Sequence, residues 1–392
     1  MKQTKIEAAF FRGGTSKAIV FNREKLPTDR SLWNEIFLAA VGSPDSYGRQ
    51  LDGMGGGLSS LSKVCIVERS QHPDADVDYT FAQVLIKAAM VDYTTMCGNM
   101  TSAIGPFAVE EGLFKCDDGD VVVRIRSTNT GKIVHARFRV EDGEALVDGN
   151  LSIPGVAGTG APVKLEFCSP GGASTGKLLP TGSVVTTLDV PGVGKIQCSM
   201  VDAANACVFV KATDVGLSGA ETPEAIEKNS DVMGKLGAIR LVASVAMGIS
   251  KNVDDAAKKP SIPFIGIVSE PQDSPYPEGN FIQAEQMDVT GRMLSNGQVH
   301  RALPLTCTVC LAIAAKIKGS VVHQVSRAIP EAEHSFRIGI PSGVLVVSAK
   351  VDLIDGKWHA ENGSVYRTQR RMFEGSVLVR SSRIGNALAK PA

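Results

Sequence analysis

The segment DYTTMCGNMTSAIG, residues 92–105, places a cysteine directly before a glycine and an asparagine. Gly98 and Asn99 allow a sharp turn, and the small residues that follow predict a helix that begins at about Asn99. A thiol at this position lies at a helix N-terminus, where free N–H groups lower its pKa and bind a substrate carboxylate. The alternative is a buried structural cysteine, so the local sequence leaves two interpretations of Cys97 open.

Lys63 stands at the start of the apolar strand pattern KVCIVE, after the glycine-rich stretch DGMGGGLSS. A lysine at a strand end commonly extends to water, but a desolvated one has a lowered pKa and becomes a base. The glycines do not fit the phosphate-binding spacing G-x-x-x-x-G-K-[ST], which argues against a nucleotide site. Lys63 is therefore a candidate base with a structural alternative.

Two further turns carry groups that suit an anion. The stretch FFRGGTSKAIVF predicts a strand, a tight glycine turn bearing Thr15 and Ser16, and a second strand. An ordinary β-turn explains it equally well. The stretch SNGQVHRALPLT places His300 and Arg301 directly before another helical pattern, and a structural role for His300 is the alternative there.

The cysteines and histidines form no metal-binding pattern. The motif CTVC, residues 307–310, has C-x-x-C spacing, but no second pair accompanies it and it lies within the apolar helical stretch LTCTVCLAIAA. We therefore predict core packing there and no bound metal. Neither G-x-S-x-G nor G-x-G-x-x-G follows a predicted strand, which argues against a serine hydrolase and a dinucleotide enzyme.

The sequence predicts a chain made mainly of short strands, and these strands hold the candidate residues in place. Apolar stretches such as KAIVF, SKVCIVE and VVVRIR alternate with turn residues, which indicates mixed β structure. Residues 30–41 repeat apolar side chains at helical spacing after Asp29, a suitable N-cap. Two helices poor in bulky side chains, at 97–113 and 306–318, fall one in each half. This pattern predicts two similarly built domains, each with a sheet around a central helix.

Length and charge narrow the class of protein. A chain of 392 residues exceeds the size at which one core usually splits into two domains. Lys plus Arg equals Asp plus Glu, 41 each, so no net field attracts nucleic acid or an anionic membrane. No stretch approaches the roughly 20 apolar residues that span a bilayer, and the first residues lack a signal core. We expect a cytoplasmic protein whose eight cysteines are mostly free thiols.

Several motifs occur together in a recognisable order. They are FRGGTSK, GSPD, RQLDGMGG, SK, CGNMTSAIG, LPTG, VDAAN, HRA and RRMFEG, between about residues 10 and 379. With them the chain resembles the 2-methylaconitate cis–trans isomerase (PrpF) family, whose relatives include 3-methylitaconate Δ-isomerase and 4-oxalomesaconate tautomerase. The stretch LSSLSK is nearer the methylaconitate type, whereas Ala18 and Ala206 depart from the residues common in the family.

The resemblance implies an α+β, diaminopimelate epimerase-like fold of two pseudo-symmetric domains, each a curved sheet wrapped around a central helix. The first domain is expected at 1–184 with a C-terminal tail at about 377–392, and the second at 185–376. The family's catalytic cleft lies between the domains and uses no cofactor. Its relatives suggest a homodimer.

The resemblance also implies roles for single residues. The family's catalytic lysine and cysteine match Lys63 and Cys97, which exchange protons with an unsaturated tricarboxylate such as 2-methylaconitate or aconitate. Either residue is the base in this expectation. The expected substrate-binding residues are Thr15, Ser16, Gly98, Asn99, Met100, Arg292, His300 and Arg301. The alternatives are an oxalomesaconate tautomerase, a methylitaconate-type Δ-isomerase and a non-catalytic carboxylate-binding protein.

Overall fold

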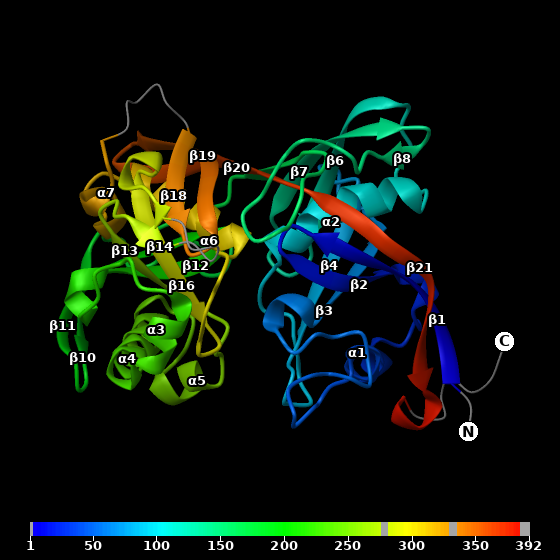
Figure 1. Ribbon diagram of the computed structural model, residues 1–392, viewed down its shortest axis with the longest axis horizontal. Coiled ribbons are helices and arrows are strands. Elements are labelled where there is room, and N and C mark those ends of the chain that lie inside the picture. Colours follow the sequence, from blue (N-terminus) through cyan, green and yellow to red (C-terminus); the bar gives the residue numbers. More distant parts are fainter. Residues whose placement is uncertain (1–2, 276–280, 329–334, 385–392) are drawn as a thin grey trace. The chain divides into compact units, whose positions relative to one another are not determined.

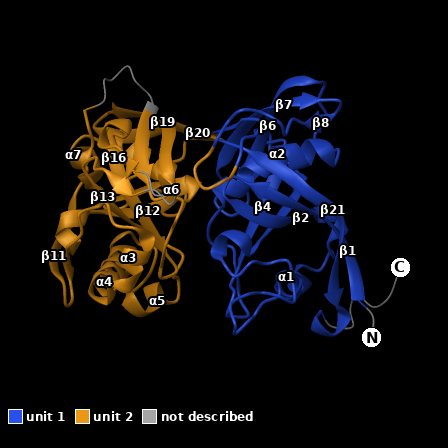
Figure 2. Ribbon diagram, viewed as in Figure 1, with its two compact units in different colours: residues 1–152, 158–165, 367–392 blue, residues 153–157, 166–366 orange. Residues whose placement is uncertain are grey.

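The structure is a computed structural model that describes residues 3–275, 281–328 and 335–384. The chain forms two compact units, which Figure 2 shows in different colours. Unit 1 contains residues 1–152, 158–165 and 367–392, and unit 2 contains residues 153–157 and 166–366.

These divisions differ from the domain boundaries expected near residues 184 and 376. Gly172 N donates to Asp202 O at 2.7 Å, and Asp202 N donates to Leu178 O at 2.9 Å, so the loop before residue 184 is bonded to unit 2. The last strand pairs with the first strand of the chain from Gln369 onward. Of the expected C-terminal tail, residues 385–392 lie outside the described residues.

Unit 1 is built mainly from the first 165 residues and the last strand (Figure 1). Its elements are β1 (Gln3–Gly13), β2 (Ser16–Asn22), α1 (Trp33–Val41), β3 (Lys63–Arg69), β4 (Val77–Val84), β5 (Val91–Asp92), α2 (Gly98–Glu110), β6 (Gly119–Ser127), β7 (Ile133–Glu141), β8 (Glu144–Ala145), the first half of β9 (Val163–Cys168) and β21 (Gln369–Arg380).

The sheet of unit 1 runs in the order β21, β1, β2, β3, β4, β6, β7. Neighbours are antiparallel except for the parallel pairs β2–β3 and β4–β6. Helix α2 contacts six of these strands, and its first eleven residues are buried. A Cβ on Gly105 would lie 2.7 Å from the Phe138 ring, so the small residues predicted for this helix are what let it approach the sheet.

Helix α1 covers the other face of the same sheet. Phe37 of α1 shares one core cluster with Val64 and Ile66 of β3. Because side chains alternate along a strand, Lys63 and Cys65 leave the opposite face, which α2 covers. The sheet therefore separates a purely apolar core from the face that carries Lys63.

Unit 2 follows the same plan with its own elements (Figure 1). They are the second half of β9, β10 (Thr186–Val190), β11 (Gly194–Ala203), β12 (Asn205–Lys211), α3 (Pro223–Lys228), α4 (Ser230–Ala246), α5 (Val253–Ala257), β13 (Phe264–Ser269), β14 (Ser274–Pro275), β15 (Phe281–Ile282), β16 (Val289–Ser295), β17 (Gln298–Val299), α6 (Leu305–Lys316), α7 (Val321–Val325), β18 (Ser335–Ile340), β19 (Gly343–Ile354) and β20 (Lys357–Arg367).

The sheet of unit 2 runs β10, β11, β12, β13, β16, β18, β19, with parallel pairs only at β12–β13 and β16–β18. This is the same succession of antiparallel and parallel pairs as in unit 1. The buried helix α6 follows β17 just as α2 follows β5, and α4 packs on the other face of the sheet as α1 does. The predicted α+β class and the central helix in each half are confirmed.

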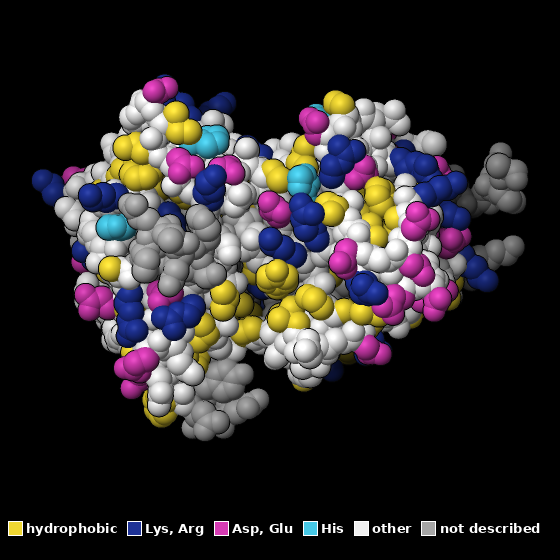
Figure 3. Space-filling view, turned by 90° about the horizontal axis from the view of Figure 1, so that it is seen from above, with side chains coloured by type: hydrophobic (Ala, Val, Ile, Leu, Met, Phe, Trp, Pro, Cys, Tyr) yellow, Lys and Arg dark blue, Asp and Glu magenta, His cyan; other side chains and the backbone are white. Residues whose placement is uncertain are grey.

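The face seen in Figure 3 shows no one-sided charge. In the view of Figure 3, basic and acidic side chains are interspersed. Of the helices in the described residues, none is both long and apolar enough to cross a bilayer.

Candidate active site

Cys97 caps the N-terminus of the central helix of unit 1. It has extended backbone angles (φ −103°, ψ 101°), and its carbonyl accepts from Thr101 N and Thr101 Oγ1, both at 3.0 Å. Its thiol is partly exposed. The first turn of α2 carries no acidic residue, and among the described residues no side chain caps it. The sulfur therefore lies at the positive end of a helix whose N–H groups are available to an anion.

Lys63 is buried at the start of β3, with 8% of its surface exposed. Its Nζ donates to Gln83 Oε1 at 2.5 Å and lies 4.9 Å from the centroid of the Phe81 ring. Gln83 is itself fixed, because its amide donates to Ser59 O at 3.1 Å and Ser62 O at 2.8 Å. The amine is thus held in one place and largely shielded from water, as a proton-transferring lysine requires.

The two candidate groups lie on the same side of the unit 1 sheet. Lys63 leaves β3 on the face that α2 covers, and Cys97 is the N-cap of α2. Cys65 is two residues from Lys63 on that face, and its Sγ lies 3.7 Å from the hydroxyl of Tyr79. That hydroxyl donates to Cys97 O at 3.4 Å. Burial raises the pKa of Cys65, and its neighbour Cys97 raises it further. Cys65 therefore stays a neutral thiol beneath the site, and Cys97 is the less buried of the two cysteines.

The glycine turn between β1 and β2 is seated on the first turn of α2. A Cβ on Gly13 would lie 2.6 Å from Asn99 O, and one on Gly14 would lie 2.3 Å from Asn99 Oδ1. Gly14 also has φ +50°, a left-handed conformation that favours glycine. Asn99 Nδ2 donates to Thr15 Oγ1 at 3.1 Å. Gly13 is needed because its backbone meets the backbone of Asn99, and Gly14 because a Cβ there would collide with the Asn99 side chain.

The predicted residues of unit 1 come together around this contact. Ser16 begins β2 directly after the turn and is buried, and Met100 is fully buried in the first turn of the helix. The structure thus groups seven of the ten predicted residues at one end of α2: Thr15, Ser16, Lys63, Cys97, Gly98, Asn99 and Met100. The carboxylate-binding roles proposed for them stay predictions.

Two residues at the junction of β20 and β21 join the group and were missed from the sequence. Arg367 is 3% exposed, and its Nε donates to Asn99 Oδ1 at 3.1 Å. Burial lowers the pKa of Arg367 to about 10. Gln369 lies opposite Gly13 across β1 and β21 and is 2% exposed. The only sequence signal is the alternation in RTQRR, which places Arg367, Gln369 and Arg371 on one face of an extended chain.

Arg292 and Arg301 in unit 2 have structural partners. Gly291 faces α6, since a Cβ there would meet Leu311 of that helix at 3.1 Å, so Arg292 leaves the opposite face of β16. There it is 1% exposed and donates to Glu221 O at 2.9 Å. Arg301 is an exposed side chain that pairs with Glu227 at 2.9 Å and with Glu224 at 3.1 Å. The structure therefore brings neither guanidinium to the N-terminus of α6.

His300 occupies a more interesting position. Its Nε2 is 2.8 Å from Ser295 Oγ, and its ring centroid is 5.9 Å from that of Phe264. The strand registers relate this place to the site in unit 1. Ile19 pairs with Val64, the fourth residue of β2 with the second of β3, and Val208 pairs with Ile265 in the same way. By this register Phe264 is the counterpart of Lys63. By its place as the N-cap of α6, Pro304 is the counterpart of Cys97, the N-cap of α2.

The CTVC motif lies inside α6, and both of its cysteines are fully buried. Cys310 Sγ is 3.4 Å from Val201 O, a core contact. Within the described residues, no group of three or more histidine, cysteine or acidic side chains has the geometry to hold a metal.

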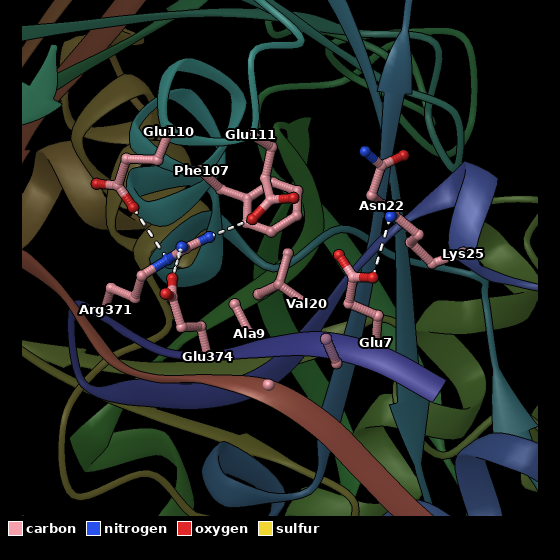
Figure 4. Close-up of a pocket in the computed structure, with 12 residues that line it drawn as sticks. Glu7, Ala9, Val20, Asn22, Lys25, Phe107, Glu110, Glu111, Arg371 and Glu374 are labelled. Carbon is pink, nitrogen blue, oxygen red and sulfur yellow. Dashed lines mark hydrogen bonds and ion pairs between the residues drawn. The ribbon is translucent and has the colours of Figure 1, made fainter. Parts of the chain in front are cut away.

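The far end of α2 is anchored differently. Figure 4 shows Arg371 of β21 between three carboxylates, those of Glu110, Glu111 and Glu374. The guanidinium also lies over the Phe107 ring, 5.8 Å from its centroid. Burial raises the pKa of Glu110 to about 7, although Arg371 opposes this rise. These residues line a cavity of about 530 Å³ at the opposite end of the helix from Cys97.

Known proteins resemble the chain along nearly its whole length. A family model described as PrpF protein matches residues 3–380. The chain is 41% identical to the 3-methylitaconate isomerase of Eubacterium barkeri over 384 residues, which cover 97% of this chain and 99% of that protein. It is 36% identical to the 2-methyl-aconitate isomerase of Cupriavidus necator, with 96% and 98% covered.

Solved structures agree with the fold. The crystal structure of a methylitaconate-delta-isomerase matches with a TM-score of 0.82 at 41% identity over 100% of both chains. A hydroxyproline epimerase from Agrobacterium vitis matches with a TM-score of 0.54 at 13% identity over 98% of both chains. The predicted epimerase-like fold is confirmed.

Proposed function

This chain belongs to the PrpF family and is an isomerase, and on that premise we propose that it moves or rotates a double bond in an unsaturated polycarboxylate by proton transfer between Lys63 and Cys97. The observation that carries the proposal is the placement of a buried, hydrogen-bonded amine and a helix-capping thiol on the same face of one sheet. No cofactor is needed for this chemistry, because a carbon acid beside a carboxylate can be deprotonated directly once its charge is stabilised.

The reaction balances without an oxidant. One group removes a proton from the allylic carbon, and the electron pair of that C–H bond forms a new double bond. The old double bond becomes the other half of a dienolate, with charge on a carboxylate oxygen. The second group then delivers a proton two carbons away, or at the first carbon after rotation. Lys63 as base and Cys97 as acid is one assignment, and the reverse is the other.

The dienolate charge needs donors that are already in place. The N–H groups of the first turn of α2 point toward such an anion, and Asn99 and Thr15 stand beside them. Arg367 brings a positive charge to the same turn. Their donors supply the electrostatic stabilisation that is usually the largest contribution to catalysis of this kind.

The substrate has two leading candidates. The stretch LSSLSK favours 2-methylaconitate or aconitate, whereas the 41% identity to a 3-methylitaconate isomerase favours 3-methylitaconate. Proton NMR in deuterated water with 2-methylaconitate, trans-aconitate, 3-methylitaconate and 4-oxalomesaconate separates them, because it reports both turnover and the carbon that gains deuterium. Absence of isomerisation and of deuterium exchange with all four compounds would overturn the proposal.

We further propose that the enzyme works as a cytoplasmic homodimer with a small-molecule substrate and without nucleic acid or membrane partners. All eight cysteines are free thiols, which suits a reducing compartment. Light scattering of the purified protein measures its mass, and a monomer at micromolar concentration would contradict the dimer.

A further inference from the structure

Gln369 is a buried amide for which the fold provides no hydrogen bond. It is 2% exposed, and within the described residues neither its Oε1 nor its Nε2 has a partner. A buried amide that has lost its water and gained nothing destabilises the folded protein, so native structures rarely keep one without another use. The use must lie within reach of the side chain.

The strand register shows where this side chain points. Gln369 is the direct partner of Gly13 across β1 and β21, and paired residues of antiparallel strands leave the same face of the sheet. A Cβ on Gly13 would meet Asn99 O at 2.6 Å and Met100 Cα at 3.0 Å. Gln369 therefore leaves β21 toward the first turn of α2.

The neighbours of Gln369 along the chain agree. Arg367, two residues before, donates to Asn99 Oδ1, and Arg371, two residues after, pairs with Glu110 at the other end of α2. The intervening Thr368 accepts from Arg12 with its hydroxyl on the other face. Arg367, Gln369 and Arg371 thus form a row along α2, in which Gln369 lies between the guanidinium at the helix N-terminus and the one at its C-terminus.

We propose that the Gln369 carboxamide binds a carboxylate of the substrate at the N-terminal turn of α2, beside Arg367, and helps the enzyme to select substrates that carry this carboxylate. The inference rests on the proposed function, because it assigns the ligand of the same site. The NH₂ group supplies two donors, and a carboxylate oxygen is the acceptor that the helix N-terminus and Arg367 attract to the same place. The bound carboxylate accepts hydrogen bonds from the amide and so offsets the free energy that its burial without a partner costs the folded protein.

The test is the variant Gln369→Leu, which keeps the shape of the side chain and removes its polar atoms. The first measurement is the affinity for propane-1,2,3-tricarboxylate, a saturated anion that cannot be isomerised, by titration calorimetry. We expect binding to weaken about 10- to 100-fold. With the substrate that the wild type turns over, KM should rise by a similar factor while kcat changes less.

Thermal unfolding supplies the second measurement. An apolar residue of the same shape in place of an unpartnered amide should leave Tm unchanged or raise it. Gln50→Leu is the matched control, because Gln50 is equally buried but donates to Ser43 and Ser62 and accepts from Gly57 N. It should lower Tm clearly. Arg370→Leu, a change on the other face of the same strand, should bind the anion like the wild type.

Each outcome decides something. Unchanged affinity and KM in Gln369→Leu would overturn the inference, and so would a loss of Tm as large as that of Gln50→Leu, which would reveal a structural partner. Binding of the saturated anion by a wild type that isomerises no substrate would overturn the proposed function alone. A wild type that binds no polycarboxylate would overturn both.

Discussion

The two units repeat one order of strands, each around its own central helix, yet the two residues proposed to exchange protons lie in only one of them. At the start of the fourth strand in the two sheet orders, unit 1 has Lys63 (β3) and unit 2 has Phe264 (β13). At the helix N-cap, unit 1 has Cys97 and unit 2 has Pro304. The comparison teaches that the strand order and the buried helix form whether or not a lysine and a cysteine stand at these two positions.

The other ends of the two helices differ in the opposite sense. Helix α6 ends with Lys316, a cation that suits the negative end of a helix dipole. Helix α2 ends with Glu110 and Glu111, which do not, and Arg371 from β21 compensates for them. In unit 1 the C-terminus of the helix is thus fixed to the last strand, whereas no side chain among the described residues caps its N-terminus.

The largest expected effect concerns the reactive pair. Lys63→Ala and Cys97→Ser should each lower kcat by at least about 1,000-fold, because each removes a proton donor or acceptor. Circular dichroism and Tm should stay close to those of the wild type. The control is Cys307→Ala, which changes a buried cysteine in the first turn of α6 and should retain turnover. A Cys97→Ser enzyme with a near-normal rate would end the assignment.

The second effect concerns stability. Arg371→Met keeps the contact with Phe107 but leaves three carboxylates together, so at pH 8 the free energy of unfolding should fall by about 3 to 4 kcal/mol. Lys316→Met, the counterpart in unit 2, should cost less than about 1 kcal/mol. Urea unfolding of both variants measures the difference. Equal losses would mean that the Arg371 cluster adds nothing to the anchoring of α2.

The third effect is the pH dependence that Glu110 introduces. Its pKa is about 7 in the folded protein against an ordinary 4.5, so between these values the folded state holds a proton that the unfolded state has released. The stabilisation is present below pH 4.5 and is lost as the pH rises through 7. Relative to Glu110→Gln, the wild type should lose about 3 kcal/mol of unfolding free energy over this window. A difference that does not vary with pH would place the titration elsewhere.

The smallest effect concerns the turn between β1 and β2 in unit 1 and its counterpart between β11 and β12 in unit 2. Gly14→Ala should lower kcat/KM by about tenfold, because the new Cβ displaces Asn99. Gly112→Ala is the control, since Gly112 has φ +66° but no atom within 4 Å of its Cβ position. This variant should lower the stability and leave the activity unchanged. In unit 2 the turn residue is Ala204 at φ 58°, and Ala204→Gly should stabilise the protein by about 0.5 kcal/mol. Equal activity of the two glycine variants would show that the close contact with Asn99 is unimportant.

The local sequence singles out Cys97 and Lys63 as candidates, each with a structural alternative, and it gives no such indication for Arg367 or Gln369. Cys97 and Lys63 stand out because their residue types are chemically informative next to a helix start and a strand start. Arg367 donates to Asn99 of this helix from 268 residues away, and Gln369 lies opposite Gly13, because the strand after residue 368 pairs with the first strand of the chain. No local pattern contains that pairing.

The contacts of Arg292 and Arg301 show a second limit. Arg292 and Arg301 are cations close in sequence to α6, but strand alternation turns the first to the α4 side of its sheet, and acidic residues of α3 engage the second. Hydrophobic periodicity predicted the elements and the buried helices correctly, because the residues that an element buries recur at the period of that element. The side on which a charge finds its partner depends on tertiary contacts that the spacing does not record.

The pairing of β1 with β21 also sets an order of events on the ribosome. The first strand emerges at once, but its neighbour on one side, Gln369–Arg380, is among the last segments to be made. At about 5 to 20 residues per second, that edge waits on the order of 20 to 70 s. Most of unit 2 is contiguous in the chain and can close its sheet during this time. Unit 1, which carries Lys63 and Cys97, is therefore the last to be completed, so a nascent chain contains these two residues long before their sheet has all of its strands.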